Sequence, residues 1–178
     1  MINYEQVESS FFDANKSYCE TIESKLKTLN LECSGFCNAY GYEVATTYDM
    51  NGYVFHLRFH KHQSTQNAVI GAQDAIDYAG VEVFVHGLSK RLKVIVGRSM
   101  FRRLFCGTEI KETIPEPYFM KFSHPVDKNF IDNFSKCILN CQIAKLTIKY
   151  GKLSCVIHTQ TLDPIHLITE IKKIISSI

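Results

Sequence analysis

An Asn-Gly pair between two alternating stretches constrains the fold of this 178-residue chain more than any other feature. Residues 42–48 and 53–59 both show a period of two, and Asn51-Gly52 stands between them. Asn and Gly accept the positive φ of a type I′ turn, so the pattern predicts a β-hairpin. A two-residue turn there places these pairs on one face: Met50 with Tyr53, Tyr48 with Phe55, Thr46 with Leu57, and Val44 with Phe59.

The same alternation predicts two further hairpins. In the first, a four-residue turn over residues 87–90 sets Val85 against Leu92 and Val83 against Val94. In the second, a tight turn at Tyr150-Gly151 joins two short strands, whose facing residues are Ala144 with Ile157, Leu146 with Cys155, and Ile148 with Leu153. Each pair of strands has one apolar face, which is typical of an antiparallel sheet buried on a single side.

Apolar residues at helical spacing predict helices that cover this buried side. We expect helices over residues 15–30, 66–78, 99–105 and 126–141, a strand over 118–122, and a last helix with Asp163 as N-cap and Pro164 at its first position. The predicted fold is therefore α+β, an antiparallel sheet built from three hairpins plus one further strand and covered by helices on one face. We expect one α+β domain over residues 1–178, with sub-units 1–64 and 65–178 as the alternative division.

Composition narrows the class of protein and its compartment. Hydrophobic residues make up 46% and charged residues 21% of the chain, values that exclude disordered and fibrous classes. The first residues carry acids where a signal peptide has lysines, and no run reaches the ~18 apolar residues that a membrane-spanning helix needs. The odd number of cysteines, seven, does not suit a disulfide scaffold. We therefore predict a cytoplasmic protein with reduced thiols and no transmembrane segment.

A group of histidines is the first candidate for chemistry. His56, His60 and His62 share one face of the predicted hairpin, and the register brings Glu43 opposite His60. Two imidazoles at His-x-His spacing can share a metal ion, but His56 and His60 are roughly 13 Å apart along one strand. We therefore favour a solvated polar face over a metal site.

Two pairs of thiols are the second candidate. Cys33 and Cys37 flank Ser34-Gly35-Phe36, which could form the turn of a zinc knuckle. Cys137 and Cys141 lie four residues apart on a strongly patterned helix, where both would face the core. Since free cysteine packs as a small hydrophobic side chain, we favour core packing and expect neither a metal nor another cofactor.

Six basic residues form the third candidate, and the only one for which we predict a site: Lys90, Arg91, Lys93, Arg98, Arg102 and Arg103. A cationic surface of this kind suits phosphates, acidic partners or an anionic membrane face. The alternative is that these residues only keep exposed strand edges from aggregating. Because no nucleic-acid-binding motif is present, we expect no nucleic acid partner. The nearby Phe101 and Phe105 are interpreted as core anchors.

From Gln66 onward, the predicted order of helix, three strands, helix, two strands and helix is similar to that of the type III secretion chaperone-like fold. This resemblance covers about the last two-thirds of the chain and rests on element order alone. It implies a non-enzymatic, often dimeric module that binds another polypeptide.

Motifs of nucleotide-binding, hydrolase and metalloprotease sites are absent from the sequence. We therefore predict a binding or interaction module with a protein partner or a homodimer. The alternative is a small-molecule carrier or enzyme with a cavity between the sheet and the last helix, for which Tyr40, Tyr42, Tyr48 and Tyr53 would supply apolar walls.

Overall fold

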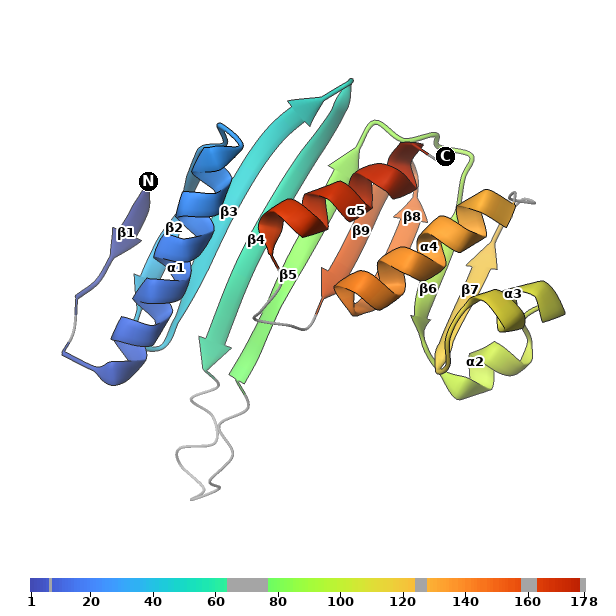
Figure 1. Ribbon diagram of the computed structural model, residues 1–178, viewed down its shortest axis with the longest axis horizontal. Coiled ribbons are helices and arrows are strands. Elements are labelled where there is room, and N and C mark those ends of the chain that lie inside the picture. The colour runs from blue at the N-terminus through green and yellow to red at the C-terminus, as the bar shows by residue number, and fades with distance from the viewer. Residues whose placement is uncertain (7, 64–76, 124–127, 158–162, 177–178) are drawn as a thin grey trace, which may run out of the picture.

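A computed structural model describes the chain apart from residues 7, 64–76, 124–127, 158–162 and 177–178 (Figure 1). The strands are β1 (Ile2–Tyr4), β2 (Cys33–Asn38), β3 (Gly41–Met50), β4 (Tyr53–Gln63), β5 (Asp77–His86), β6 (Val94–Arg98), β7 (Tyr118–Phe122), β8 (Ile143–Lys149) and β9 (Lys152–Ile157). The helices are α1 (Ser10–Thr28), α2 (Met100–Leu104), α3 (Thr108–Thr113), α4 (Lys128–Cys141) and α5 (Pro164–Ser176).

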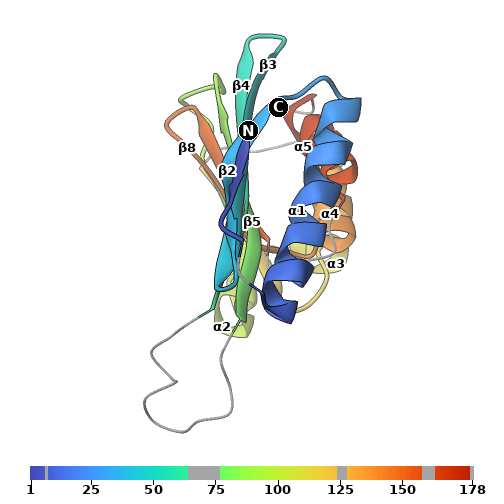
Figure 2. The ribbon, with the colours of Figure 1, turned by 90° about the vertical axis from the view of Figure 1, so that its left-hand side faces the viewer.

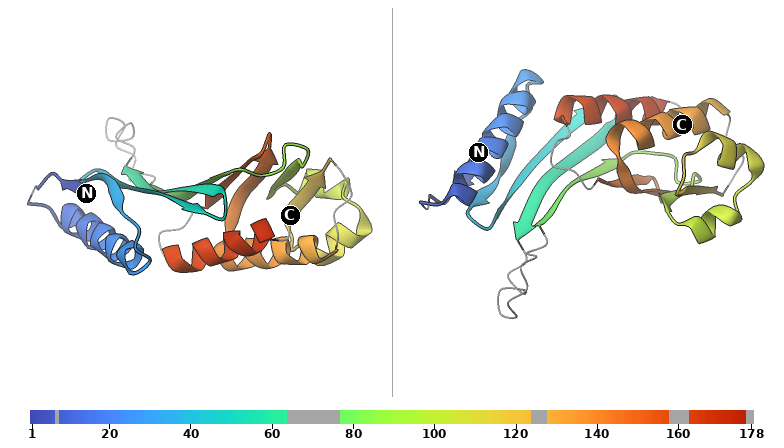
Figure 3. Two further views of the ribbon diagram at one scale, coloured as in Figure 1. Left: turned by 90° about the horizontal axis from the view of Figure 1, so that it is seen from above. Right: turned by 60° about the horizontal axis from the view of Figure 1, so that its bottom comes forward.

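The nine strands form one sheet in the order β1-β2-β3-β4-β5-β9-β8-β6-β7. β1 pairs with β2 in parallel, and the other neighbouring strands are antiparallel. Helices α1, α4 and α5 lie along one face of this sheet (Figures 2 and 3). The predicted α+β fold, with an antiparallel sheet covered on one face, is confirmed.

The hairpin at Asn51-Gly52 has the predicted register. Met50 faces Tyr53, and the pairing continues through Val44 opposite Phe59. Asn51 and Gly52 have φ values of 53° and 80°, as a type I′ turn requires. Val44, Phe55, Leu57 and Phe59 are buried on the side that faces the helices. Turn chemistry and alternation therefore act together to fix which face of the strands is buried.

The hairpin predicted between residues 81–85 and 92–96 is wrong. Residues 81–85 lie in β5 and residues 94–96 in β6, and their valines are buried, but β5 pairs with β4 and β9, whereas β6 pairs with β7 and β8. Two strands from the C-terminal part of the chain therefore lie between β5 and β6 (Figure 1). An alternating strand can bury its apolar face beside any strand whose apolar residues point to the same side of the sheet. Alternation alone therefore does not determine which strand becomes its neighbour.

The C-terminal hairpin is confirmed over most of its length. Leu146 faces Cys155 and Ile148 faces Leu153, with positive φ values of 53° at Tyr150 and 76° at Gly151 in the turn. The expected pairing of Ala144 with Ile157 is wrong, because a β-bulge shifts the register and Ile143 takes that place. A bulge inserts one extra residue into one strand, and the alternation on either side of it does not reveal it.

The other expected elements agree with the structure in most cases. α2, β7 and α4 lie where helices and a strand are predicted, and α5 begins at Pro164, where the Asp163 carboxylate accepts a hydrogen bond from the Ile165 amide. α1 starts earlier than expected, with Ser9 as its N-cap. The predicted helix over 66–78 lies mostly outside the described residues, and its last two residues belong to β5. β1, β2 and α3 are not anticipated by the sequence patterns.

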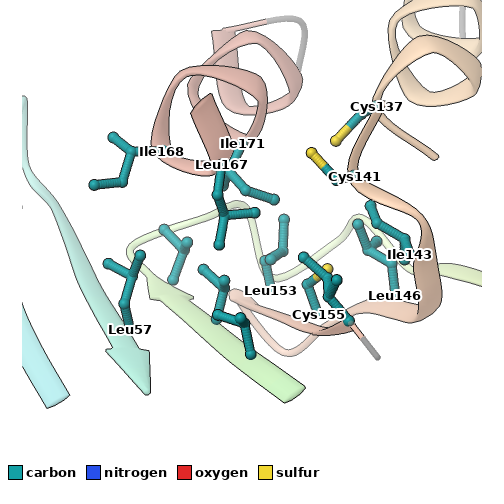
Figure 4. Close-up of a cluster of buried hydrophobic side chains, with 14 of the residues drawn as sticks. Leu57, Cys137, Cys141, Ile143, Leu146, Leu153, Cys155, Leu167, Ile168 and Ile171 are labelled. Carbon is teal, nitrogen blue, oxygen red and sulfur yellow. The ribbon is translucent and has the colours of Figure 1, made fainter. Parts of the chain in front are cut away.

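The core fills the layer between the sheet and the helices. Leu167, Ile168 and Ile171 of α5 face the apolar side of the strands, where Leu57, Leu153 and Cys155 lie (Figure 4). Cys137 and Cys141 of α4 lie above Ile143 and Leu146 at the neighbouring part of the sheet (Figure 4). All these side chains are buried, so the space beneath α5 is occupied by hydrophobic packing.

Polar contacts fix the position of α5. Its Asp163 carboxylate lies 3.1 Å from Lys25 Nζ of α1. The buried Glu170 carboxylate accepts hydrogen bonds from Lys173 Nζ at 2.6 Å and from Asn140 Nδ2 of α4 at 3.4 Å. Burial alone would raise the pKa of Glu170, but these two hydrogen bonds outweigh it and hold the pKa below its usual value.

Glu170→Gln should make the stability of the fold less sensitive to a fall in pH. A depressed pKa means that the carboxylate stabilises the fold above the ordinary glutamate pKa of about 4.3, and this contribution disappears as the pH falls through the lower folded-state pKa. Below about pH 5, the free energy of unfolding should therefore decline more steeply in the wild type than in Glu170→Gln. Urea unfolding at several pH values measures how the free energy of unfolding changes with pH in each protein. Parallel pH dependences would contradict the lowered pKa of Glu170.

Gly35→Ala should destabilise the β2–β3 pair. A Cβ at Gly35 would lie 1.8 Å from the backbone oxygen of Glu43, so the strands would have to move apart. We expect a loss of about 2 kcal/mol in the free energy of unfolding, as for other overpacked sites. Gly107→Ala is the control, since a Cβ there meets open space and the change should cost less than about 1 kcal/mol. Equal effects of the two substitutions in urea unfolding would show that the close approach is absent.

Candidate functional site

The structure divides the six predicted basic residues into three groups. Lys90, Arg91 and Lys93 are exposed in the connection before β6. Arg98 and Arg102 are exposed at the other end of β6 and on α2, roughly 16 Å away by the rise of the strand. Arg103 is only 8% exposed. Arg98 and Arg102 are therefore brought to one place, and the other four are not.

The buried side chain of Arg103 connects α2 with α3 and β7. Its Nη1 atom donates hydrogen bonds to the carbonyl oxygens of Ile114 and Tyr118, both at 2.8 Å, and Nη2 donates to Lys111 O at 2.7 Å. Lys111 and Ile114 belong to the end of α3, where carbonyl groups lack helical partners. The guanidinium therefore fixes the side of α2 that carries Arg103 against α3 and β7.

This anchoring turns the apolar side of α2 outward. At about 100° per residue, Met100, Phe101, Leu104 and Phe105 fall within an arc of roughly 140°, and Arg103 lies outside it. These four side chains are between 54% and 77% exposed. The prediction that Phe101 and Phe105 are core anchors is wrong, although their rings contact each other in an edge-to-face arrangement with centroids 5.3 Å apart.

Two hollows lie beside this stripe on the outer face of the sheet. The first, of about 410 Å³, is lined by residues 95–98 of β6 and by Arg102, Phe119 and Lys145. The second, of about 450 Å³, has a more apolar lining that includes Phe105, Met120 and Phe119, with Lys121 and Arg102 at its border. A Cβ at Gly97 would lie only 3.2 Å from the Phe119 ring. The absence of a side chain at Gly97 therefore leaves room in the first hollow.

Contacts with aromatic residues hold Arg98 and Arg102 in place. Arg102 Cζ lies 5.3 Å from the centroid of the Phe119 ring, and these two residues belong to the lining of both hollows. Arg98 Nε donates a hydrogen bond to Tyr118 Oη at 2.9 Å, and Tyr118 Oη donates to Ile143 O at 2.7 Å. Both cations therefore have fixed positions next to apolar surface, an arrangement that suits a ligand with anionic and apolar parts.

We name this region the α2 surface. It consists of the apolar residues Met100, Phe101, Leu104 and Phe105 and the cationic residues Arg98, Arg102, Lys121 and Lys145. Of these, only Arg98 and Arg102 are predicted as site residues from the sequence. The sequence feature that could have revealed this surface is the spacing of the four apolar residues, which places them on one side of a helix with Arg103 outside that side. Periodicity alone, however, does not show which side of a short helix is buried.

His56, one of the three histidines considered as metal ligands, contacts residues outside that group. His56 Nδ1 lies 2.9 Å from Thr47 Oγ1, and its ring contacts His86 with centroids 5.3 Å apart. Glu43 forms an ion pair with Arg58. The side chain of His62 lies outside the described part of the structure. Among the side chains that the structure describes, no group of three histidine, cysteine or acidic residues could hold a metal ion.

The cysteine pairs pack in the core. Cys33 and Cys37 are buried in β2, so Ser34-Gly35-Phe36 form part of a strand rather than a knuckle turn. Cys137 and Cys141 are buried on α4. Burial raises the pKa of the Cys33, Cys37 and Cys155 thiols, which favours the neutral form over the thiolate that binds metals.

Comparisons with protein families, curated proteins and solved structures find no match. The likeness to the type III secretion chaperone-like fold therefore stays one of predicted element order. None of the helices in the described ranges has the length and apolar character that a bilayer-spanning segment requires.

The two adjacent arginines of α2 should respond differently to substitution. Arg103→Met should lower the free energy of unfolding by about 3 kcal/mol, because it leaves buried carbonyl oxygens without donors. Arg102→Met should cost less than about 1 kcal/mol, since Arg102 is exposed. Urea unfolding measures both changes. A small effect at Arg103 would show that it does not clamp α2, α3 and β7.

Proposed function

We propose that this protein is a binding module that docks a partner with anionic and apolar groups through the α2 surface. The observation that carries the proposal is the outward-facing stripe of Met100, Phe101, Leu104 and Phe105 beside Arg98 and Arg102. Single exposed apolar residues are ordinary, but adjacent ones rimmed by polar groups mark interaction sites. Covering one such side chain completely contributes about 1.5–3 kcal/mol, so a partner that covers the stripe gains a substantial free energy of binding.

The chemistry of the hollows favours binding over catalysis. Their described lining consists of apolar, cationic, hydroxyl and thiol side chains and backbone, with no carboxylate or imidazole that could serve as a general base. The described packing also favours a surface site over an enclosed one, because Leu153, Cys155, Leu167 and Ile171 fill the layer beneath α5. The seven free thiols support a reducing, cytoplasmic setting for this module.

The proposal is tested with anilinonaphthalene sulfonate, a fluorescent probe that is both apolar and anionic. We expect the wild type to bind it and to show amide shifts in an NMR titration that centre on α2, β6 and β7. Phe101→Ser/Phe105→Ser removes apolar area and Arg98→Gln/Arg102→Gln removes charge, so each double variant should weaken probe binding about ten-fold or more.

The matched control is Phe11→Ser, which removes a phenylalanine of similar exposure, 60%, from α1. It should leave the affinity for the probe unchanged. Thermal unfolding of each variant establishes that the fold is intact. If the α2 variants and the Phe11 variant bind the probe equally, the α2 surface is not a binding site of this kind.

A further inference from the structure

We infer that the partner of the α2 surface is the face of an anionic lipid bilayer, into which α2 inserts its apolar stripe while the flanking cations contact lipid phosphates. This inference rests on the proposed function and assigns the occupant of the same surface. It does not follow from the element-order resemblance, which implies a polypeptide partner.

The shape of the surface favours a bilayer over a peptide. A peptide segment binds most readily in a groove that encloses its side chains, as in the known modes of helix and strand recognition. Here the protein's own side chains project, since Phe101, Leu104 and Phe105 are each more than two-thirds exposed. α2 also lies at one end of the molecule, beside the sheet and away from α1 (Figures 1 and 3). A projecting apolar stripe at an extremity can enter the boundary between headgroups and acyl chains.

The charges are complementary to an anionic lipid surface. Arg98, Arg102, Lys121 and Lys145 are exposed and border the two hollows beside the stripe. Lys111 adds a further cation, since its Nζ lies 3.0 Å from Leu104 O of α2. The acid Glu116 lies nearby, 3.6 Å from Arg103 Nε, where it pairs with the buried guanidinium. Cations at the border of an apolar stripe can stay at headgroup level while the stripe enters the membrane.

The short length of α2 implies reversible binding. The stripe belongs to a helix of five residues and its C-cap, so only a few apolar side chains can be inserted. Each Lys or Arg close to an anionic leaflet strengthens binding roughly five-fold at physiological salt, and this attraction is screened as salt rises. Both contributions are therefore needed, and removing either should release the protein.

The chain contains no tryptophan, so Phe101→Trp introduces a single fluorescent reporter within the stripe. We expect its emission to shift to the blue and to be quenched by brominated acyl chains on vesicles of phosphatidylcholine with phosphatidylserine. Vesicles of phosphatidylcholine alone should have little effect. Phe11→Trp, at an exposed site on α1, is the matched control and should not respond to either vesicle. Leu104→Trp provides a second reporter if Phe101→Trp does not fold.

Co-sedimentation with the same vesicles separates the two contributions. Lys121→Gln/Lys145→Gln should weaken binding about 25-fold, or about five-fold for each charge removed. Phe101→Ser/Phe105→Ser should abolish binding although it keeps every charge. Phe11→Ser should bind as the wild type does, and raising the salt concentration should release the wild-type protein.

Three results would overturn the inference. If anilinonaphthalene sulfonate binds at α2 but the vesicles do not, the proposed function holds and the lipid assignment fails. If a peptide of alternating glutamate and phenylalanine shifts the emission of the Phe101→Trp variant and vesicles leave it unchanged, the partner is a polypeptide. If that emission shifts with protein concentration alone and sedimentation shows dimers, the surface binds a second copy of the chain.

Discussion

Burial of one face of the nine-stranded sheet is the interaction on which the rest of the structure depends. Inward residues such as Phe55, Leu57 and Phe59 pack beneath helices on that face, and their parity decides where every other strand residue points. Phe119, Lys121 and Lys145 have the opposite parity from buried neighbours such as Met120 and Leu146, so they fall on the uncovered face, next to α2. One-sided burial thus places Lys121 and Lys145 beside the outward stripe of α2, whereas Arg98 has the parity of the buried Val94 and Val96 and is exposed because it is the last residue of β6.

Short-range signals made most of the fold predictable. The turn at Asn51-Gly52 fixes φ locally, and the alternation around it specifies the register, so the β3–β4 hairpin follows from adjacent residues. The pairing of β5 with β9 joins segments about seventy residues apart, and no local pattern selects β9 over β6. β1 has only three residues, and in β2 Gly35 interrupts the alternation, because it stands at the inward position between Cys33 and Cys37 where an apolar side chain would continue the pattern. Such strands depend on neighbours that the sequence does not identify.

The candidate site was predictable only in part, because charge and apolarity do not determine burial on a short helix. Arg98 and Arg102 are exposed as expected, but Arg103 is buried since the end of α3 offers it carbonyl acceptors. That clamp reverses the usual orientation of an amphipathic helix, with apolar side chains in solvent and a guanidinium in the core. The sequence supplies the residues of the stripe, and tertiary hydrogen bonds decide which way it faces.

The most direct test of this account is the solvent exposure of the α2 stripe in the free protein. A soluble paramagnetic agent broadens NMR signals of ring protons according to their access to solvent. The account predicts that the rings of Phe101 and Phe105 broaden as strongly as that of Phe11, whereas the buried Phe55 and Phe134 are little affected, at every protein concentration. Protection of Phe101 and Phe105 equal to that of Phe134 would contradict it, because the stripe would then be covered within the molecule or by a second copy.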